Sequence, residues 1–243
     1  MENHLRGGFQ LKTKDLSQLT VDAVLCISLH SREDRRNALL ESFRDSGLKI
    51  DFFLVDKDVD NPERGCFNSH RAVAGKILEH GWKRVLVLED DCTLEPFSPK
   101  LVTRINRFLH NRDPEIFYLG VLLRQCWLTW NIGIARCRGF GTHAYMISDQ
   151  GCRKILAWED YVGKAIDILF YRRLKGYCAF PMIVFQNEVS PSDIEAERIG
   201  RTEKGKNIDR SGSFKCTIES KDDLMKKQYS SAWKYWRRTL LRK

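Results

Sequence analysis

The sequence predicts an α/β fold with a Rossmann-like, mostly parallel sheet flanked by helices. Between residues 24 and 88, short apolar runs of strand length alternate with amphipathic segments of helical length. This order of strand, helix, strand, helix and strand is typical of parallel sheets, because each helix returns the chain to the start of the next strand. The 243 residues, 42% of them hydrophobic, are enough to bury a sizeable core.

The first half supplies three strands and two helices. Gly47 and Gly81 end the two helices, because glycine readily adopts the left-handed conformation found after a helix. We expect strands at 24–29, 52–55 and 85–88, and helices at 34–45 and 69–80.

In the second half of the domain, apolar runs and amphipathic segments again predict strands and helices. Residues 121–143 are expected to be irregular, because glycines, arginines and two tryptophans are scattered through them. We expect strands at 116–119, 144–147 and 181–185, and helices at 101–110, 150–157 and 167–175.

The domain is expected to span residues 21–195, with other kinds of segment on each side. Residues 1–20 are polar and irregular, which predicts a flexible arm, and residues 196–222 are typical of a polar linker or loop. Residues 223–243 predict a basic amphipathic helix. Seven of the nine net positive charges belong to residues 226–243.

The predicted basic helix, residues 223–243, either contacts an anionic membrane surface peripherally or packs on the domain with its charged side chains in water. The remaining chain is nearly neutral, so we expect no nucleic acid as a partner. No apolar run is long enough to span a bilayer, and the N-terminus does not resemble a signal sequence. The eight cysteines form no C-x-x-C pair, so a zinc-ribbon or thioredoxin-like site has no support. Because a signal sequence is not recognised, we expect reduced thiols and a cytoplasmic protein, either free or peripheral on a membrane surface.

Three consecutive acids, Glu89, Asp90 and Asp91, follow the strand at 85–88. In open α/β sheets ligands bind beyond the carboxyl ends of the strands. Carboxylates held this close repel one another unless a cation joins them, and hard ions such as Mg²⁺ or Mn²⁺ prefer oxygen ligands. The triplet therefore indicates a metal site, with a solvated acidic turn as the alternative.

Several segments, in order, resemble glycosyltransferase family 25, the lipooligosaccharide and procollagen galactosyltransferases. The resemblance covers about residues 23–194. The matching blocks are Arg32-x-Asp34-Arg35, Gly65-Cys66-x-x-Ser69-His70, Leu86-x-Leu88-Glu89-Asp90-Asp91, Gly141-Thr142-x-Ala144-Tyr145-x-Ile147-Ser148, Asp167 and Ser192-Asp193-Ile194.

The resemblance implies a GT-A-type fold and an inverting transfer of a hexose, galactose before glucose, from a UDP-sugar. The acceptor would be a hydroxyl of a glycan, glycolipid or glycoprotein, as in lipopolysaccharide biosynthesis. Mn²⁺ or Mg²⁺ would be the cofactor, with Asp91 as its first ligand and Glu89 as its second. Glu89 or Asp90 would otherwise bind the ribose or a metal-bound water. A catalytically degenerate binding or adhesion protein is the alternative, and a metal-dependent nuclease is disfavoured by the neutral body.

The remaining implied roles each have a plainer alternative. Arg32 and Arg35 would contact the nucleotide or its phosphates, or form surface ion pairs with Glu33 or Asp34. Ser69 and His70, expected at a helix N-terminus, would face the donor, or Ser69 would be an N-cap and His70 would orient a loop.

The same holds for the acceptor side of the site. Asp167 would be the catalytic base, with Glu188 and Asp193 as rivals, or an acid placed by the helix dipole. Gly141 and Thr142 would shape the floor of the sugar pocket. Trp127 and Trp130 would stack on acceptor sugars or anchor a mobile loop.

Overall fold

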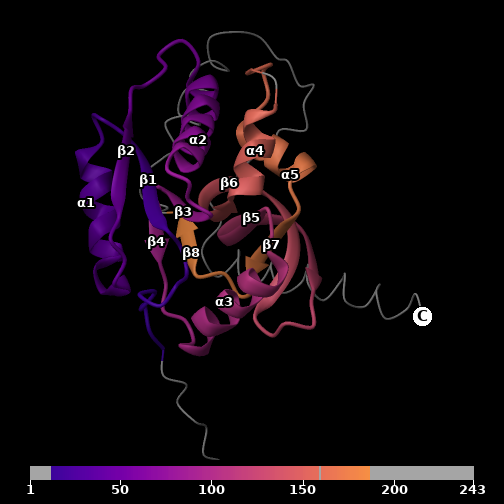
Figure 1. The fold of residues 1–243 in the computed structure, drawn as a ribbon. Coiled ribbons are helices and arrows are strands. Elements are labelled where there is room, and N and C mark those ends of the chain that lie inside the picture. The colour runs from indigo at the N-terminus through magenta and orange to yellow at the C-terminus, as the bar shows by residue number, and fades with distance from the viewer. Residues whose placement is uncertain (1–11, 159, 187–243) are drawn as a thin grey trace, which may run out of the picture.

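The computed structural model describes residues 12–158 and 160–186. Its main feature is a six-stranded sheet in the order β2-β1-β3-β6-β5-β7 (Figure 1). The strands are β1 (Ala23–Leu29), β2 (Asp51–Val55), β3 (Arg84–Glu89), β5 (Ile116–Leu128), β6 (Ile134–Ser148) and β7 (Gly176–Ala179). A two-stranded sheet of β4 (Cys92–Leu94) and β8 (Val184–Gln186) lies beside it.

Five of the six strands run in one direction. Strand β1 pairs in parallel with β2 and β3, and β5 pairs in parallel with β7. Strand β6 is antiparallel to β3, β5 and β7 and is the single reversed strand of this sheet. The predicted α/β fold with a mostly parallel sheet flanked by helices is confirmed.

Helices cover both faces of the sheet. Strand β3 shows why: its side chains Val85 and Val87 belong to one core, whereas Leu86 and Leu88 belong to the other. Helices α2, α4 and α5 pack on the first face, and α1 and α3 pack on the second (Figure 1). Their bounds are α1 (Glu33–Ser42), α2 (Pro62–Glu79), α3 (Lys100–Arg112), α4 (Asp149–Leu156) and α5 (Ile166–Arg173).

The prediction that residues 121–143 are irregular was wrong, because they form most of a long β-hairpin. Its strands pair from Ile116 with Ile147 to Leu128 with Ala135, with three shifts of register along the way. Glycines at these irregular positions hid the strand pattern, since glycine inside a strand is often read as a loop signal.

Two other boundaries differ from the prediction. Helix α2 begins at Pro62, not residue 69, because Asn61 caps it by accepting a hydrogen bond from the Arg64 amide at 3.1 Å. The last strand, predicted at 181–185, is β8, and the sequence reading missed β7 and β4.

The expected N-terminal arm is packed where the structure describes it. Leu16 is fully buried, and Thr13 exchanges backbone hydrogen bonds of 2.9 and 2.8 Å with Phe97. Residues 1–11 lie outside the described residues, as do the predicted linker 196–222 and basic helix 223–243. Within the described ranges no helix has the length and apolar character needed to cross a membrane.

Candidate active site

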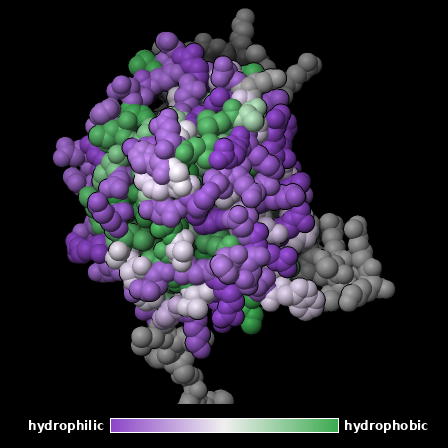
Figure 2. Space-filling view, in the orientation of Figure 1, coloured by the Kyte–Doolittle hydropathy of each residue, from purple (hydrophilic) through white to green (hydrophobic). Residues whose placement is uncertain are grey.

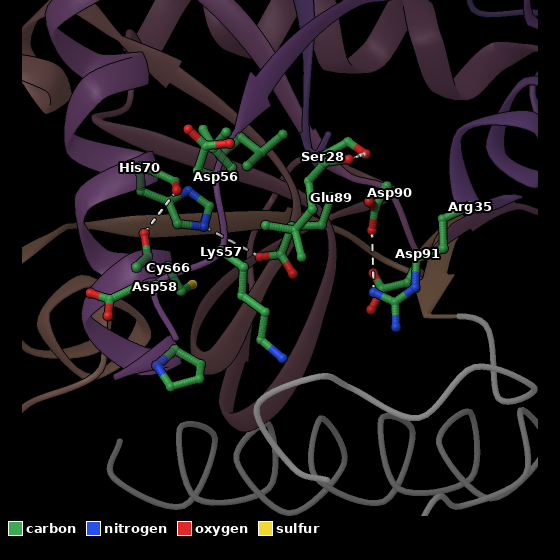
Figure 3. Close-up of a pocket in the computed structure, with 16 residues that line it drawn as sticks. Ser28, Arg35, Asp56, Lys57, Asp58, Cys66, His70, Glu89, Asp90 and Asp91 are labelled. Atoms are coloured by element: carbon green, nitrogen blue, oxygen red, sulfur yellow. Dashed lines mark hydrogen bonds and ion pairs between the residues drawn. The ribbon is translucent and has the colours of Figure 1, made fainter. Parts of the chain in front are cut away.

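A pocket opens where β1, β2 and β3 end, beside the N-terminal half of α2 (Figure 3). This is the edge of the sheet at which α/β proteins bind ligands, because strand ends and helix starts meet there. The lining residues come from five segments and are Ile27, Ser28, Leu29, Arg35, Val55, Asp56, Lys57, Asp58, Pro62, Gly65, Cys66, Ser69, His70, Glu89, Asp90 and Asp91.

Glu89 is held by two donors on one of its oxygens. His70 Nε2 lies 3.4 Å from Glu89 Oε1, and the Thr142 hydroxyl donates a hydrogen bond to the same oxygen. His70 is buried, and its Nδ1 lies 2.8 Å from the hydroxyl of buried Tyr145. Burial raises the pKa of Glu89, but the hydrogen bond and charge of His70 and the Thr142 hydroxyl outweigh it and lower the pKa overall. Glu89 is therefore an oriented carboxylate.

Asp90 faces a cation of the protein. Its Oδ1 lies 3.3 Å from Nη1 of Arg35, and both side chains are about nine-tenths buried (Figure 3). Burial raises the pKa of Asp90, although Arg35 partly opposes the shift. The ion pair fastens Arg35 of α1 to the end of β3 and forms one wall of the pocket.

Asp91 has the features of a cation ligand. Its Oδ1 is buried and accepts no hydrogen bond from any described residue, and its Oδ2 lies 3.4 Å from the Gln186 side-chain amide. Burial, and then the charge of Glu89, raise the pKa of Asp91 to about 7. A divalent cation would satisfy the buried oxygen and relieve the repulsion.

The described residues contain no group of three or more His, Cys, Asp or Glu side chains placed to hold a metal ion. Two carboxylates are nevertheless enough for Mg²⁺-type ions when substrate phosphates supply further oxygens. Asp91 and Glu89 therefore fit a metal that binds together with a phosphate-bearing ligand, and their role as its ligands stays a prediction.

Asp167 is attached to the same region through β6. It lies in the first turn of α5, and its Oδ2 accepts a hydrogen bond of 3.2 Å from the Gly141 amide. Gly141 has a φ of 84°, which an L side chain would strain. Since Thr142 contacts Glu89, adjacent residues of β6 connect the two acids. None of Asp167, Gly141 and Thr142 lines the pocket.

Two predicted donor ligands already have partners within the protein. The Arg32 guanidinium pairs with Asp34 at 3.0 Å, as the plainer alternative expected, and Arg32 is not among the pocket-lining residues. The Ser69 hydroxyl donates a 2.8 Å hydrogen bond to the Gly65 carbonyl inside α2. The prediction that Ser69 and His70 begin a helix was wrong, because α2 starts seven residues before Ser69.

The sequence reading missed the loop after β2. Asp56, Lys57 and Asp58 line the pocket (Figure 3). The Arg64 guanidinium fixes this loop by contacting both oxygens of Asp58, at 2.5 and 2.8 Å. The rule that singled out the acids after β3 also applies to these residues, since they directly follow a strand.

We expect Tyr145→Phe to lower the free energy of unfolding by about 1 kcal/mol, because one buried hydrogen bond to His70 is lost. The rate of the sugar transfer that the family resemblance implies is expected to fall about tenfold, because His70 no longer holds Glu89 in one orientation. Urea denaturation and steady-state kinetics measure the two effects. Tyr177→Phe, at a half-buried tyrosine of β7, is the matched control. Equal effects of both changes would contradict the prediction.

His143 makes stability depend on acidity. It is buried beside Thr142 on β6, and burial lowers its pKa to about 4. Between pH 6.5 and 4 the unfolded chain binds a proton that the folded protein does not, so stability falls as the pH drops. We expect a loss of about 2 kcal/mol between pH 7 and pH 5. His143→Gln should remove that part of the slope in urea titrations, whereas exposed His110→Gln should retain it.

Residues 54–170 match the family model described as "Glycosyltransferase family 25 (LPS biosynthesis protein)". A "Glycosyltransferase 25 family member" of Drosophila pseudoobscura pseudoobscura is 25% identical over 180 residues, which cover 60% of this chain and 29% of that protein. "Procollagen galactosyltransferase 1-B" of Xenopus laevis is 25% identical over 220 residues, covering 74% of this chain and 35% of the relative. The matches thus span about three-tenths of these relatives.

Two solved structures share parts of the architecture. "A197 from STIV" gives a TM-score of 0.44 at 11% identity and covers 71% of this chain and 97% of that one. A glycosyltransferase "involved in the glycosylation of the major capsid of PBCV-1" gives a TM-score of 0.41 at 11% identity, covering 75% of this chain and all of that one.

Proposed function

Because residues 54–170 match the model of glycosyltransferase family 25, we propose that the chain is a member of this family and transfers a hexose, galactose before glucose, from a UDP-sugar to an acceptor hydroxyl in a metal-dependent, inverting reaction. Galactosyl transfer is the activity in the name of the Xenopus relative. The acceptor class is a glycan, glycolipid or glycoprotein. One observation carries the proposal: in a pocket at the strand ends, a buried oxygen of Asp91 beside Glu89 accepts no hydrogen bond from the part of the chain that the structure describes.

Asp91 and Glu89 would hold Mn²⁺ or Mg²⁺, with Glu89 oriented by His70 and Thr142. The bound ion would neutralise the diphosphate charge that develops as the bond to the sugar breaks. Lys57 lines the pocket and would add a second positive charge near the phosphates.

Arg35 would contribute to phosphate binding from its ion pair with Asp90, which keeps the guanidinium at the pocket wall. Arg32 would have to leave Asp34 before it could contact a donor. We therefore assign Arg35 and Lys57 to the donor phosphates ahead of Arg32.

Asp167 is the proposed base, which would take the proton of the acceptor hydroxyl as that oxygen attacks the sugar. The Gly141 amide holds one of its oxygens, which fixes the direction of the carboxylate. The rival acids Glu188 and Asp193 lie outside the described residues.

Calorimetry with UDP in the presence of MnCl₂ or EDTA tests the donor site, and UDP release from a panel of UDP-sugars tests the reaction. We expect UDP to bind only with Mn²⁺ and one UDP-sugar to be hydrolysed fastest. A folded protein that binds no UDP under either condition would overturn the proposal. If Asp167→Asn retained both UDP binding and the native rate of UDP release, the catalytic base would have to be another acid.

A further inference from the structure

We propose that the tip of the β5–β6 hairpin, together with α3, docks on an anionic lipid bilayer. The tip comprises Leu128 to Gly133, the last residue of β5 and the turn before β6. Neither α3 nor the tip contributes a lining residue to the pocket, so the proposed docking surface is distinct from the pocket.

The tip exposes three large apolar side chains. Trp130 is fully exposed at 101%, Ile132 at 73% and Leu128 at 44%. Together they are three of the seven large hydrophobic side chains that are exposed among the described residues. A cluster of this kind within five residues of chain marks an interaction site, whereas single exposed apolar residues are ordinary.

The turn is fixed by hydrogen bonds. The Thr129 hydroxyl donates to the Ile134 carbonyl at 2.8 Å and accepts from the Asn131 amide at 3.1 Å. The Phe180 amide donates to the Gly133 carbonyl at 2.9 Å and thereby attaches the turn to the domain. A turn held in this way presents Trp130 and Ile132 without the entropy loss that a loose loop would incur on binding.

Both the hairpin and α3 carry basic side chains and no acidic ones. The hairpin, residues 116–148, contains three arginines and no Asp or Glu, and α3 contains Lys100 and three arginines and likewise no acid. In the described ranges no acidic side chain forms an ion pair with Arg104, Arg107, Arg136 or Arg138.

The hairpin tip and α3 adjoin each other. A Cβ placed on Gly133 would lie 3.1 Å from Cδ1 of Leu101 and 3.8 Å from Nη1 of Arg104, both in α3. Figure 1 shows α3 at the opposite end of the molecule from α2 and α4, and in Figure 2 a hydrophobic group projects at this lower edge beneath hydrophilic residues. Apolar tip and basic helix thus form one surface.

Lipid fits both halves of this surface. Tryptophan prefers the membrane interface, aliphatic side chains favour the acyl region, and arginines attract the phosphates of anionic lipids. Aromatic rings hold two of the arginines in place: the Arg136 guanidinium lies 5.6 Å from the Trp127 ring, and that of Arg138 lies 5.9 Å from the Tyr171 ring. A soluble polyanion would match the arginines but leave Leu128 and Ile132 in water.

Vesicle co-sedimentation of the full chain tests the proposal. We expect binding to vesicles of 70% phosphatidylcholine and 30% phosphatidylglycerol, and little binding to pure phosphatidylcholine. The double variant Trp130→Ser/Ile132→Ser should lower the partition coefficient by about tenfold or more. Arg136→Gln/Arg138→Gln should lower it by about 30-fold.

Matched controls remove side chains of the same kind at positions outside the proposed surface. Val59→Ser/Val162→Ser removes two exposed apolar residues, and Arg153→Gln/Lys164→Gln removes two exposed charges. Both should bind vesicles like the native chain. A third variant replaces the seven basic residues of 226–243 by glutamine and measures the contribution of that segment.

Several outcomes would overturn the proposal. One is unchanged binding in both tip variants with binding lost only in the 226–243 variant, which would place membrane contact in that segment alone. Another is binding of a soluble sulfated glycan without vesicle binding, which would make the surface a glycan site. Equal losses in the controls would show general electrostatic adsorption. UDP binding, measured on the same samples, reports on the pocket separately.

Discussion

Asp91→Asn is expected to lower the proposed metal-dependent turnover of a UDP-sugar by about 1,000-fold, because the proposed ion, which would stabilise the leaving diphosphate, would lose a ligand. The amide keeps the size of the carboxylate, so the fold should persist. Calorimetric titration with Mn²⁺ and UDP should show the loss of binding, and UDP release should show the loss of turnover.

The same change should stabilise the protein in the absence of metal. Burial and Glu89 raise the pKa of Asp91 to about 7, so between pH 4 and 7 the unfolded chain gives up this proton before the folded protein does. Folded stability therefore falls as the pH rises through this range, and asparagine removes the penalty. Thermal unfolding in EDTA at pH 8 checks the sign. Asp160→Asn, at a fully exposed side chain, is the control and should alter neither turnover nor stability.

Gly120→Ala is expected to lower the free energy of unfolding by about 3 kcal/mol or more, because the new methyl group has no space. A Cβ at this position would lie 2.1 Å from the Val184 carbonyl oxygen and 2.5 Å from His143 Nε2. The backbone of β8 cannot move aside without disturbing its pairing with β4, which continues the chain from the acidic triplet. Urea denaturation measures the loss.

Gly75→Ala provides the opposite case. Gly75 lies inside α2, and no atom comes within 4 Å of a Cβ placed there. Alanine should raise the free energy of unfolding by about 0.5–1 kcal/mol, since it loses less backbone entropy than glycine in a helix. If both glycine variants were destabilised equally, the space around Gly120 would not be the cause.

The sequence was sufficient to predict the parallel part of the fold. Strands β1 and β3 are apolar runs that are largely buried on both faces, so they stand out from the helices that follow them. The β5–β6 hairpin was missed because its outer part has alternating exposure, such as exposed Arg136 and Arg138 around buried Cys137, and is interrupted by glycines. Its pairing partners lie on another strand, so local sequence carries little of that signal.

The site was predictable where it follows from strand ends. Glu89, Asp90 and Asp91 came from that rule, and Asp56 to Asp58 would have come from it as well. The partnership of His70 with Tyr145 was not predictable from local pattern, because 75 residues separate them and only sheet packing brings the ring to the hydroxyl.

Strand β6 also sets the distance between the proposed membrane-binding tip and the proposed base. It runs from Ile134, directly after the proposed membrane-binding tip, to Gly141 beside the proposed base, and seven residues of strand span roughly 23 Å. A lipid-anchored acceptor would need a spacer of that length, several sugar units long, between the bilayer surface and the hydroxyl that reacts. Acceptor series that differ only in spacer length would then show a threshold, with short head groups left out of reach.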